Sequence, residues 1–430
     1  MEYWNTYKGH KAKKVGKEEP FDNNIYTFDI ETTSYIILNN KQYNTIDYLS
    51  FSQENKDNCV FMSTMYIWMF GINEQIYYGR TWGEFIDFLD ILEKNIPYKK
   101  YIFVHNLSYE FQFLRNCLNF SNVFSRKSRK VIKCELEDYN IEFRCTYYMT
   151  NLKLEKVAKT YNLDTKKLVG NLDYTKSRHS NTKLNKKELD YCENDCLVVY
   201  EYIKLQLEKF KHVKKLPLTS TGFVRKELKK KLYRNFSYQR KVQKSINTDG
   251  HIYNLLYKAF QGGYTHANWT KAGEIIKNVT SFDFTSSYPY VMLTEKYPST
   301  EFKKCNIKSI NQIIDNFCYI IRVKFTNIRC KYYNNFISYS KCESITSGRY
   351  DNGRVMGADE LEIVLTDVDL KFIFETYKFD SYEFIEVYWS HKDYLPIEYI
   401  NFILDKYENK TKFKNVERQR NRICIRKSKI

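Results

Sequence analysis

Hydrophobic and polar positions alternate in short runs over the first part of the chain. The apolar runs at residues 25–30 and 101–105 are typical of β-strands, with polar turns between them. Residues 150–161 and 184–210 instead predict helices. The second helix carries apolar side chains at steps of four and three, which predicts one buried stripe: Cys192, Cys196, Val199, Ile203 and Leu207. Strands interleaved with helices over the first ~210 residues favour an α/β unit.

The character of the chain changes after residue 217, where a strongly basic stretch begins. Residues 225–244 contain nine basic side chains and a single acid, Glu227. Such a stretch is typical of a solvated basic helix and equally of a helix that contacts phosphates. Beyond it, residues 260–268 and 281–292 are expected to form loop and strand segments around a Gly-Gly turn.

The last part of the chain is rich in Phe, Tyr and Ile. Residues 305–388 show few helix signals before a predicted helix at 366–377, and a last helix is expected at 396–407. Residues 418–430 carry neither apolar periodicity nor a turn pattern, and eight of the last twenty residues are basic.

The composition narrows the class of protein. At 430 residues, with 43% hydrophobic and 17% aromatic side chains, the chain is too long for one compact core and too aromatic for disorder. The chain contains only 14 Gly and 6 Pro, and this low content excludes collagen-like and low-complexity proteins. The net charge of +18 predicts a polyanionic partner, and the dense aromatics favour nucleic acid. Drift towards Lys, Asn, Ile and Tyr in an AT-rich genome would explain the same composition without a partner.

The sequence also indicates the cellular compartment in which the protein is expected. No stretch approaches the roughly 18 consecutive apolar residues of a spanning helix, and residues 1–17 are polar and basic. Eleven cysteines, an odd number without a C-x-x-C pair, indicate neither a disulfide framework nor a zinc ribbon. We therefore expect a cytoplasmic protein with no membrane partner.

Three short polar runs in the first half carry candidate chemistry. In YTFDIET (26–32), Asp29 and Glu31 are two positions apart on a predicted strand, so both side chains leave the same face. Two like charges this close repel unless a cation lies between them, and carboxylate oxygens suit Mg²⁺ or Mn²⁺. A D-x-E pair by itself also occurs by chance in most chains of this length.

The other two runs are VHNLSYEF (104–111) and YCEND (191–195). In the first, an apolar strand leads into a polar cluster that ends in Glu110. In the second, Tyr191 and Asp195 are four residues apart and lie on one helical face. A buried tyrosine beside a capping or salt-bridged Asp would account for that pair alone, but not for the order of all three runs.

In this order and spacing, the three runs resemble the exonuclease motifs of family B DNA polymerases, which recur across the DEDD class of 3′–5′ exonucleases. The resemblance implies a ribonuclease H-like domain in which Asp29, Glu31 and Asp195 hold two divalent ions, Mg²⁺ or Mn²⁺. Such ions would activate a water and stabilise the attacking and leaving oxygens of the terminal phosphodiester. Tyr191 would orient the water or the scissile phosphate.

The resemblance also assigns residues to the frayed single-stranded 3′ end of DNA. Thr32, His105, Asn106 and Tyr109 would hold this end. Tyr109 would act by stacking and Asn106 by hydrogen bonding. The second motif normally ends in Asp, whereas this chain has Glu110. Because its side chain is one methylene longer, Glu110 would ligate through a shifted backbone or through water.

A segment before the third motif, LVGNLDY (168–174), is similar to one in protein-primed bacteriophage polymerases, where a catalytic lysine precedes the glycine. In this sequence that position is Val169, with Lys166 and Lys167 nearby. Either a neighbouring lysine substitutes for the catalytic one, or this charge is missing.

Residues 281–289, SFDFTSSYP, closely resemble polymerase motif A, D-x-x-S-L-Y-P, with Ser287 in place of Leu. The match implies that Asp283 ligates the polymerase metals and that the carbonyl of Phe284 assists. Tyr288 would pack under the sugar of the incoming nucleotide and exclude a 2′-hydroxyl. An ordinary Asp turn would account for the acid alone.

Residues 260–264, FQGGY, resemble the Y-x-G-G motif between exonuclease and polymerase domains, with Phe for Tyr. Gly262 and Gly263 would let the backbone approach the DNA template closely. Residues 362–370, EIVLTDVDL, are similar to the segment after the first terminal-protein region of the protein-primed branch. That similarity implies an insertion that contacts the priming protein.

Two polymerase motifs are not found in this sequence. Motif B, N-S-x-Y-G, would follow soon after residue 412, and motif C, Y-x-D-T-D, would lie well beyond it. We therefore expect a truncation before both motifs, through a frameshift, a premature stop, an intron or a split gene. Polymerisation by this chain alone is expected to fail, because only Asp283 serves the polymerase site.

The predicted fold class is α/β, with four parts: a ribonuclease H-like 3′–5′ exonuclease domain (1–215), a linker helix and the N-terminal part of an α+β polymerase palm (216–304), a priming-protein-contact insertion (305–390), and the start of a fingers-side helix with a truncated or frameshifted tail (391–430). The predicted protein is the N-terminal portion of a protein-primed family B DNA polymerase of bacteriophage or mobile-element type, which proofreads single-stranded DNA ends. Its partners would be DNA, deoxynucleotides in the intact enzyme, and a terminal priming protein. Two alternatives stay open: half of a split polymerase completed in trans, and a non-catalytic binder of DNA or of the priming protein.

Overall fold

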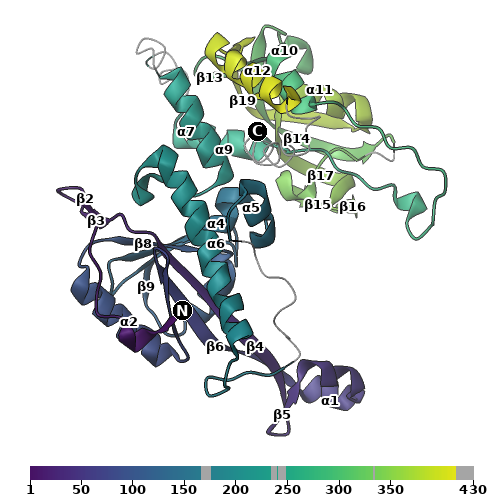
Figure 1. Ribbon diagram of the computed structural model, residues 1–430. Coiled ribbons are helices and arrows are strands. Elements are labelled where there is room, and N and C mark those ends of the chain that lie inside the picture. The colour runs from purple at the N-terminus through teal and green to yellow at the C-terminus, as the bar shows by residue number, and fades with distance from the viewer. Residues whose placement is uncertain (166–175, 234–239, 241–247, 333–334, 413–430) are drawn as a thin grey trace. The chain divides into compact units, whose positions relative to one another are not determined.

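The computed structural model describes the chain except for residues 166–175, 234–239, 241–247, 333–334 and 413–430 (Figure 1). The segment 168–174 with Val169, the neighbouring Lys166 and Lys167, most of the basic run after residue 233 and the tail at 418–430 lie outside the described residues. The chain divides into two compact units, one of Met1–Glu227 with the residues from Lys406 on, the other of Leu228–Asp405. In the part of the chain that is described, no helix is both long and apolar enough to cross a membrane.

A nine-stranded mixed sheet forms the centre of the first unit, in the order β1-β7-β6-β4-β8-β11-β10-β9 with β5 on β4. Strands β4, β8 and β11 run parallel, while β6 pairs with β4 in antiparallel register. The strands are β1 (Glu2–Tyr3), β4 (Tyr26–Leu38), β5 (Lys41–Asn44), β6 (Val60–Ile72), β7 (Gln75–Gly79), β8 (Lys100–Val104), β9 (Phe120–Ser125), β10 (Val131–Leu136) and β11 (Ile141–Cys145); β2 (Lys14–Val15) and β3 (Phe21–Asp22) form a separate ribbon.

Helices cover both faces of this sheet (Figure 1). Side chains of β8 alternate between the two faces, so that Ile102 and Val104 join one core and Tyr101 and Phe103 the other. Helix α2 contributes to the first core, and α5 and α6 to the second. The helices are α1 (Gln53–Asn58), α2 (Trp82–Asn95), α3 (Leu107–Leu114), α4 (Thr146–Thr150), α5 (Leu154–Tyr161), α6 (Lys186–Phe210) and α7 (Ser220–Leu232).

Most of the elements predicted in this unit are confirmed. The two apolar runs are β4 and β8, and the long helix is α6, whose predicted stripe is buried except for the partly buried Leu207. The helix predicted over 150–161 is interrupted, because Asn151 takes a left-handed conformation (φ 55°) that ends α4 before α5 begins. Asn185 and Glu188 form a reciprocal capping box that fixes the start of α6.

The second unit is built on an eight-stranded antiparallel sheet in the order β12-β19-β14-β17-β15. Helix α11 packs on one face, where Ile321, Val323 and Phe325 of β14 are buried, and α9 packs on the other. The strands are β12 (Lys296–Pro298), β13 (Lys303–Cys305), β14 (Phe317–Cys330), β15 (Cys342–Thr346), β16 (Arg349–Asp351), β17 (Arg354–Thr366), β18 (Tyr377–Lys378) and β19 (Ser381–Tyr394). The helices are α9 (Gly250–Ala259), α10 (Ser287–Thr294), α11 (Asp367–Thr376) and the start of α12 (Ile397–Lys412), whose residues from Lys406 on belong to the first unit. These elements confirm the predicted helices at 366–377 and 396–407.

The strand predicted within 281–292 is wrong. Residues 281–286 are irregular, and α10 follows them directly. A strand needs a neighbour to satisfy its backbone groups, and no described strand pairs with this segment. Its side chains Phe282 and Phe284 are 91% and 87% exposed, so the apolar pattern that suggested a buried strand is left open to solvent.

Candidate metal centre

Strand β4 presents two of the predicted metal ligands. Asp29 and Glu31 alternate with the core residue Ile30, so their side chains leave the opposite face of the strand. Glu31 is buried and Asp29 partly exposed. The pairing of β4 with β6 shifts by one residue between Glu31 and Thr32, a β-bulge directly beside the pair. Bulges of this kind bend a strand and redirect its side chains.

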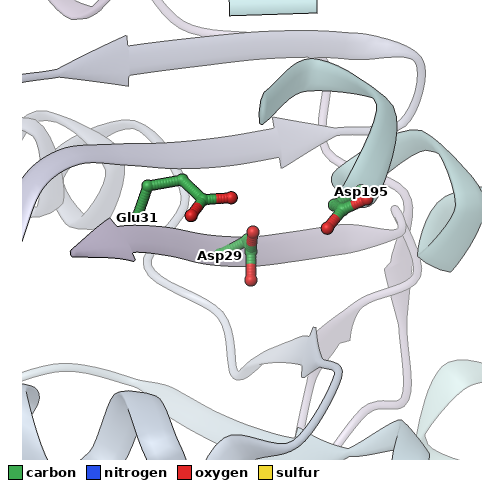
Figure 2. Close-up of side chains that lie close together, drawn as sticks. All are labelled: Asp29, Glu31 and Asp195. Atoms are coloured by element: carbon green, nitrogen blue, oxygen red, sulfur yellow. The ribbon is translucent and has the colours of Figure 1, made fainter. Parts of the chain in front are cut away.

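Helix α6 supplies the third carboxylate. Its residues Cys192 and Cys196 are buried in one cluster with Met69 of β6, which sets the rotation of the helix over the sheet. Asp195 then lies close to Asp29 and Glu31, and one oxygen of each carboxylate falls within 4.8 Å of the others. Figure 2 shows the three groups around a common space, two from the strand and one from the helix.

The donor set fits a divalent cation. Two of the three acids, Glu31 and Asp195, are buried, and three negative charges this close repel one another strongly where water is scarce. Hard oxygen donors on a rigid strand and helix are the ligands that Mg²⁺ and Mn²⁺ take.

Glu110 lies at the start of α3 and is 3% exposed. It is not one of the three residues whose oxygens converge. Among the described residues its Oε2 finds no hydrogen-bond partner. Burial raises the pKa of Glu110 well above its usual range, and the negative charge of Glu31 raises it further. Both effects disfavour the charged form of this carboxyl group when no cation is bound.

A cavity of about 500 Å³ opens over the carboxylates. Six of the residues predicted from the sequence line it: Asp29, Glu31, His105, Asn106, Tyr191 and Asp195. Sequence reasoning missed other lining residues, notably Lys130, Tyr147, Tyr148 and Lys153. One signal could have found Tyr147: it follows the end of β11 closely, just as His105 follows β8, and the two strands are parallel neighbours.

Hydrogen bonds fix several of the residues that are predicted to bind the 3′ end of single-stranded DNA. His105 Nδ1 lies 3.0 Å from the hydroxyl of Thr146, and the hydroxyls of Thr32 and Tyr109 are hydrogen-bonded to each other. Asn106 adopts a left-handed conformation (φ 68°), which turns the chain sharply from β8 into α3. Burial raises the pKa of Tyr109, and the nearby carboxylates add to this effect, so its ring remains a neutral stacking surface.

The predicted polymerase residues lie in the second unit. Asp283, Phe284 and Tyr288 are all exposed, and no metal-binding group of three among the described residues includes Asp283. Gly262 takes a positive φ of 73°, which favours glycine, and a Cβ on Gly263 would come within 2.9 Å of the Tyr288 hydroxyl. Gly263 therefore packs closely against Tyr288 of the segment that resembles motif A, whereas Gly262 meets only the ring of Phe260.

Comparison with known proteins identifies the family. The sequence profile of DNA polymerase type B, organellar and viral, matches residues 167–423, more than half of the chain. The chain belongs to this family. A search of curated proteins gives no match for this type B polymerase.

Solved structures agree with the fold. The chain is similar to Phi29 DNA polymerase complexed with primer-template DNA and incoming nucleotides (17% identity, TM-score 0.62, 95% of this chain and 68% of that one). It is also similar to Phi29 DNA polymerase complexed with single-stranded DNA (17% identity, TM-score 0.66, 94% and 66%). The type B polymerase chain thus has the predicted fold, a ribonuclease H-like unit followed by part of a palm, and spans about two thirds of the length of these polymerases.

Proposed function

We propose that this type B polymerase chain is a 3′–5′ exonuclease that shortens single-stranded DNA ends with Mg²⁺ or Mn²⁺. The observation that carries the proposal is the convergence of Asp29, Glu31 and Asp195, from a strand and a helix, to within 4.8 Å. Bound there, divalent ions would activate a water and stabilise the leaving oxygen of the terminal phosphodiester.

The residues around the carboxylates would hold the substrate. Tyr191 is buried and lines the cavity, where its hydroxyl would orient the attacking water or the scissile phosphate. Lys130 and Lys153 would attract the phosphates of the strand. His105 and Asn106 would contact the terminal nucleotide, since both line the cavity beside the carboxylates.

Tyr109 would stack on a base of the same strand. Tyr109 is 43% exposed although its hydroxyl is held by Thr32, so the exposed part of the side chain would be available to a base. Hydrolysis would release a nucleoside monophosphate and leave a new 3′-hydroxyl on the shortened strand.

For the second unit we propose the role of a partial palm, with an insertion at 305–390 for a terminal priming protein. Asp283 would ligate polymerase metals, and Phe284 and Tyr288 would contact the deoxynucleotide, once a further carboxylate is supplied. Gly262 and Gly263 would approach the template. Because two-metal nucleotidyl transfer needs more than one carboxylate, we propose that the chain alone does not polymerise DNA, whereas a separate fragment could complete it in trans.

A second candidate is a non-catalytic binder of DNA or of the priming protein. It is favoured by one observation, that Glu110 stands outside the converging carboxylates where the family motif has its fourth acid. In that case the first unit would bind a DNA strand without hydrolysing it.

The two candidates separate in one assay. Purified protein and Asp29→Ala are incubated with a 5′-labelled single-stranded oligonucleotide and Mg²⁺ or Mn²⁺. We expect stepwise shortening from the 3′ end by the wild type and none by the variant. Equal degradation by both, or none by either, contradicts the nuclease. Binding that persists in both proteins and weakens with salt would then support the binder.

A further inference from the structure

Strands β4 and β6 run past the rest of the sheet of the first unit as a two-stranded ribbon, whose end is marked by β5 and α1 in Figure 1. Strand β8 pairs with β4 only at residues 26–27, and β7 pairs with β6 only at residues 68–72. The ribbon (residues 34–64) therefore extends beyond both neighbouring strands. It consists of the ends of β4 and β6, strand β5, a 3₁₀ helix (Thr45–Ser50) and α1.

One edge of the ribbon has no strand partner. Strand β5 occupies the edge of β4, whereas no described strand pairs with the outer edge of β6 at residues 60–64. Side chains on both faces of this stretch are exposed, with Val60 at 56%, Phe61 at 56% and Met62 at 41%. An exposed apolar edge of this kind is a template on which another strand can add.

The aromatic side chains of the ribbon contact one another rather than the main cores. The ring centroids of Tyr48 and Phe61 lie 5.1 Å apart, and those of Tyr43 and Phe51 lie 5.3 Å apart. In the described part of the chain, none of these rings belongs to a hydrophobic core cluster. Two apolar side chains of the 3₁₀ helix are 59% and 80% exposed: Ile46 and Leu49. The ribbon thus leaves apolar surface open to a partner.

The charge of the ribbon indicates which partner fits. The ribbon carries two basic and three acidic side chains, a net charge of −1, in a chain whose net charge is +18. It therefore lacks the positive charge that attracts nucleic acid. Two copies of this basic chain repel each other least where their local charge is close to zero. The charge therefore favours a second copy of this chain over nucleic acid.

Strand β9 provides the opposite case. It also lies at an edge of the sheet, and its side chains Val123 and Phe124 are 41% and 51% exposed. Four basic residues follow this strand within five positions: Arg126, Lys127, Arg129 and Lys130. Basic side chains of this kind protect an edge strand against pairing with another copy.

We propose that the ribbon is a dimer interface, at which β6 of one copy pairs with β6 of a second copy. Two identical edges pair in antiparallel register about a two-fold axis, so the same residues serve both sides. Residues 60–64 of each copy would join the two sheets, and the apolar side chains of one copy would cover those of the other.

The size of the ribbon suits this role. Its 31 residues compare with the roughly 20–30 residues that one side of a stable interface contributes. The interface uses no residue of the metal centre, so the proposal is independent of the proposed nuclease.

Sedimentation velocity of DNA-free protein over about a hundredfold range of concentration tests the interface. We expect the wild type to dimerise as its concentration rises, at low and at high salt. Met62→Lys places a charge on the free edge and should raise the dimer dissociation constant at least about tenfold. The matched control is Val123→Lys, because Val123 has the same exposed fraction and lies on the other edge. This control should sediment as the wild type does.

A mixture of two variants separates a broken interface from a misfolded chain. Met62→Lys and Met62→Glu should each stay monomeric alone and form dimers when mixed, because opposite charges then meet across the two-fold axis. A monomeric wild type at the highest concentration, equal dissociation by both lysine variants, or no recovery in the mixture would overturn the proposal.

Hydrogen exchange gives a second readout on the unsubstituted protein. Backbone amides of residues 60–64 should exchange more slowly as the protein concentration rises, because strand pairing protects them. Amides of residues 120–125 should exchange at a constant rate. Protection that rises equally in both segments, or in neither, would contradict the assignment of the interface to the ribbon.

Discussion

The candidate catalytic acids of the two units lie in different structural surroundings. In the first, Asp29, Glu31 and Asp195 come from elements held in a nine-stranded sheet and its covering helix, and their oxygens converge. In the second, Asp283 lies on an exposed irregular segment and belongs to no converging group among the described residues. A motif therefore becomes a site only where strands and helices from distant parts of the sequence meet around it.

The largest difference between the units should appear in nuclease activity. Asp195→Asn removes one of three converging charges and is expected to lower the rate of 3′ shortening about 10³-fold, because several kcal/mol of transition-state stabilisation are lost. Asp283→Asn is the matched change in the second unit and should leave the rate unchanged. Single-turnover digestion of a labelled oligonucleotide measures the cleavage rates of both variants. Equal losses of rate would contradict the assignment of the nuclease site to the first unit.

A buried carboxylate network should matter far more for stability than an exposed ion pair. Asp22 is fully buried and accepts hydrogen bonds from Lys13, Asn24 and Tyr26. Asp22→Asn is expected to cost about 3 kcal/mol of unfolding free energy. In the second unit, Asp315→Asn removes only an exposed pair with Lys371 and should have no measurable effect. Urea unfolding compares them.

The same carboxylate predicts the response of stability to acid. Burial alone would raise the pKa of Asp22, but hydrogen bonds from His10, Tyr26 and other donors outweigh it and lower the pKa to about 2. The unfolded chain has a value near 4. The stability from Asp22 is therefore present above about pH 4 and is lost as pH falls towards 2. If the unfolding free energy of Asp22→Asn falls as steeply with decreasing pH as that of the wild type, Asp22 is not the source of the acid sensitivity.

Glu110 should respond to pH in the opposite direction. Burial raises its pKa, so its contribution to stability is present below the ordinary pKa of Glu and is lost as pH rises through the raised value. In metal-free protein, Glu110→Gln should gain stability over the wild type as pH rises from 4 to 8, and should show no gain below pH 4. Thermal melts across this range measure the gain, and a constant difference at all pH values would exclude burial of the acid as its cause.

The smallest effect is expected at the hydrogen bond that holds the stacking tyrosine. Thr32→Val removes the partner of the Tyr109 hydroxyl and should lower kcat/KM two- to fivefold, about 0.5–1 kcal/mol. Ser34→Ala, which breaks a similar bond to Ser63 farther along β4, is the control. Equal effects of the two changes would show that the bond serves the strand and not the substrate.

Local periodicity was enough to predict much of the first unit. The alternation around Asp29 and Glu31 placed both acids on one face, and the four-residue step placed Tyr191 beside Asp195 on α6. Neither rule contains the distance between the strand and the helix. That distance depends on the packing of Cys192 and Cys196 against β6, a contact between residues far apart in the sequence.

The failures have the same physical origin. Tyr147 and Lys130 reach the cavity only because β8, β11 and β10 are neighbours in the sheet, and strand order cannot be read from a local pattern. The strand predicted within 281–292 is missing because a strand requires a hydrogen-bonding neighbour. The helix that begins at Ser287 was hidden by the apolar run before it.

Mn²⁺ binding measured by electron paramagnetic resonance tests the central claim most directly, because it reports the converging carboxylates without requiring DNA. The account predicts that wild-type protein and Asp283→Ala bind Mn²⁺ alike, and that Asp29→Ala loses this binding. Equal binding by all three proteins, or a loss confined to Asp283→Ala, would contradict the assignment of the metal site to the first unit.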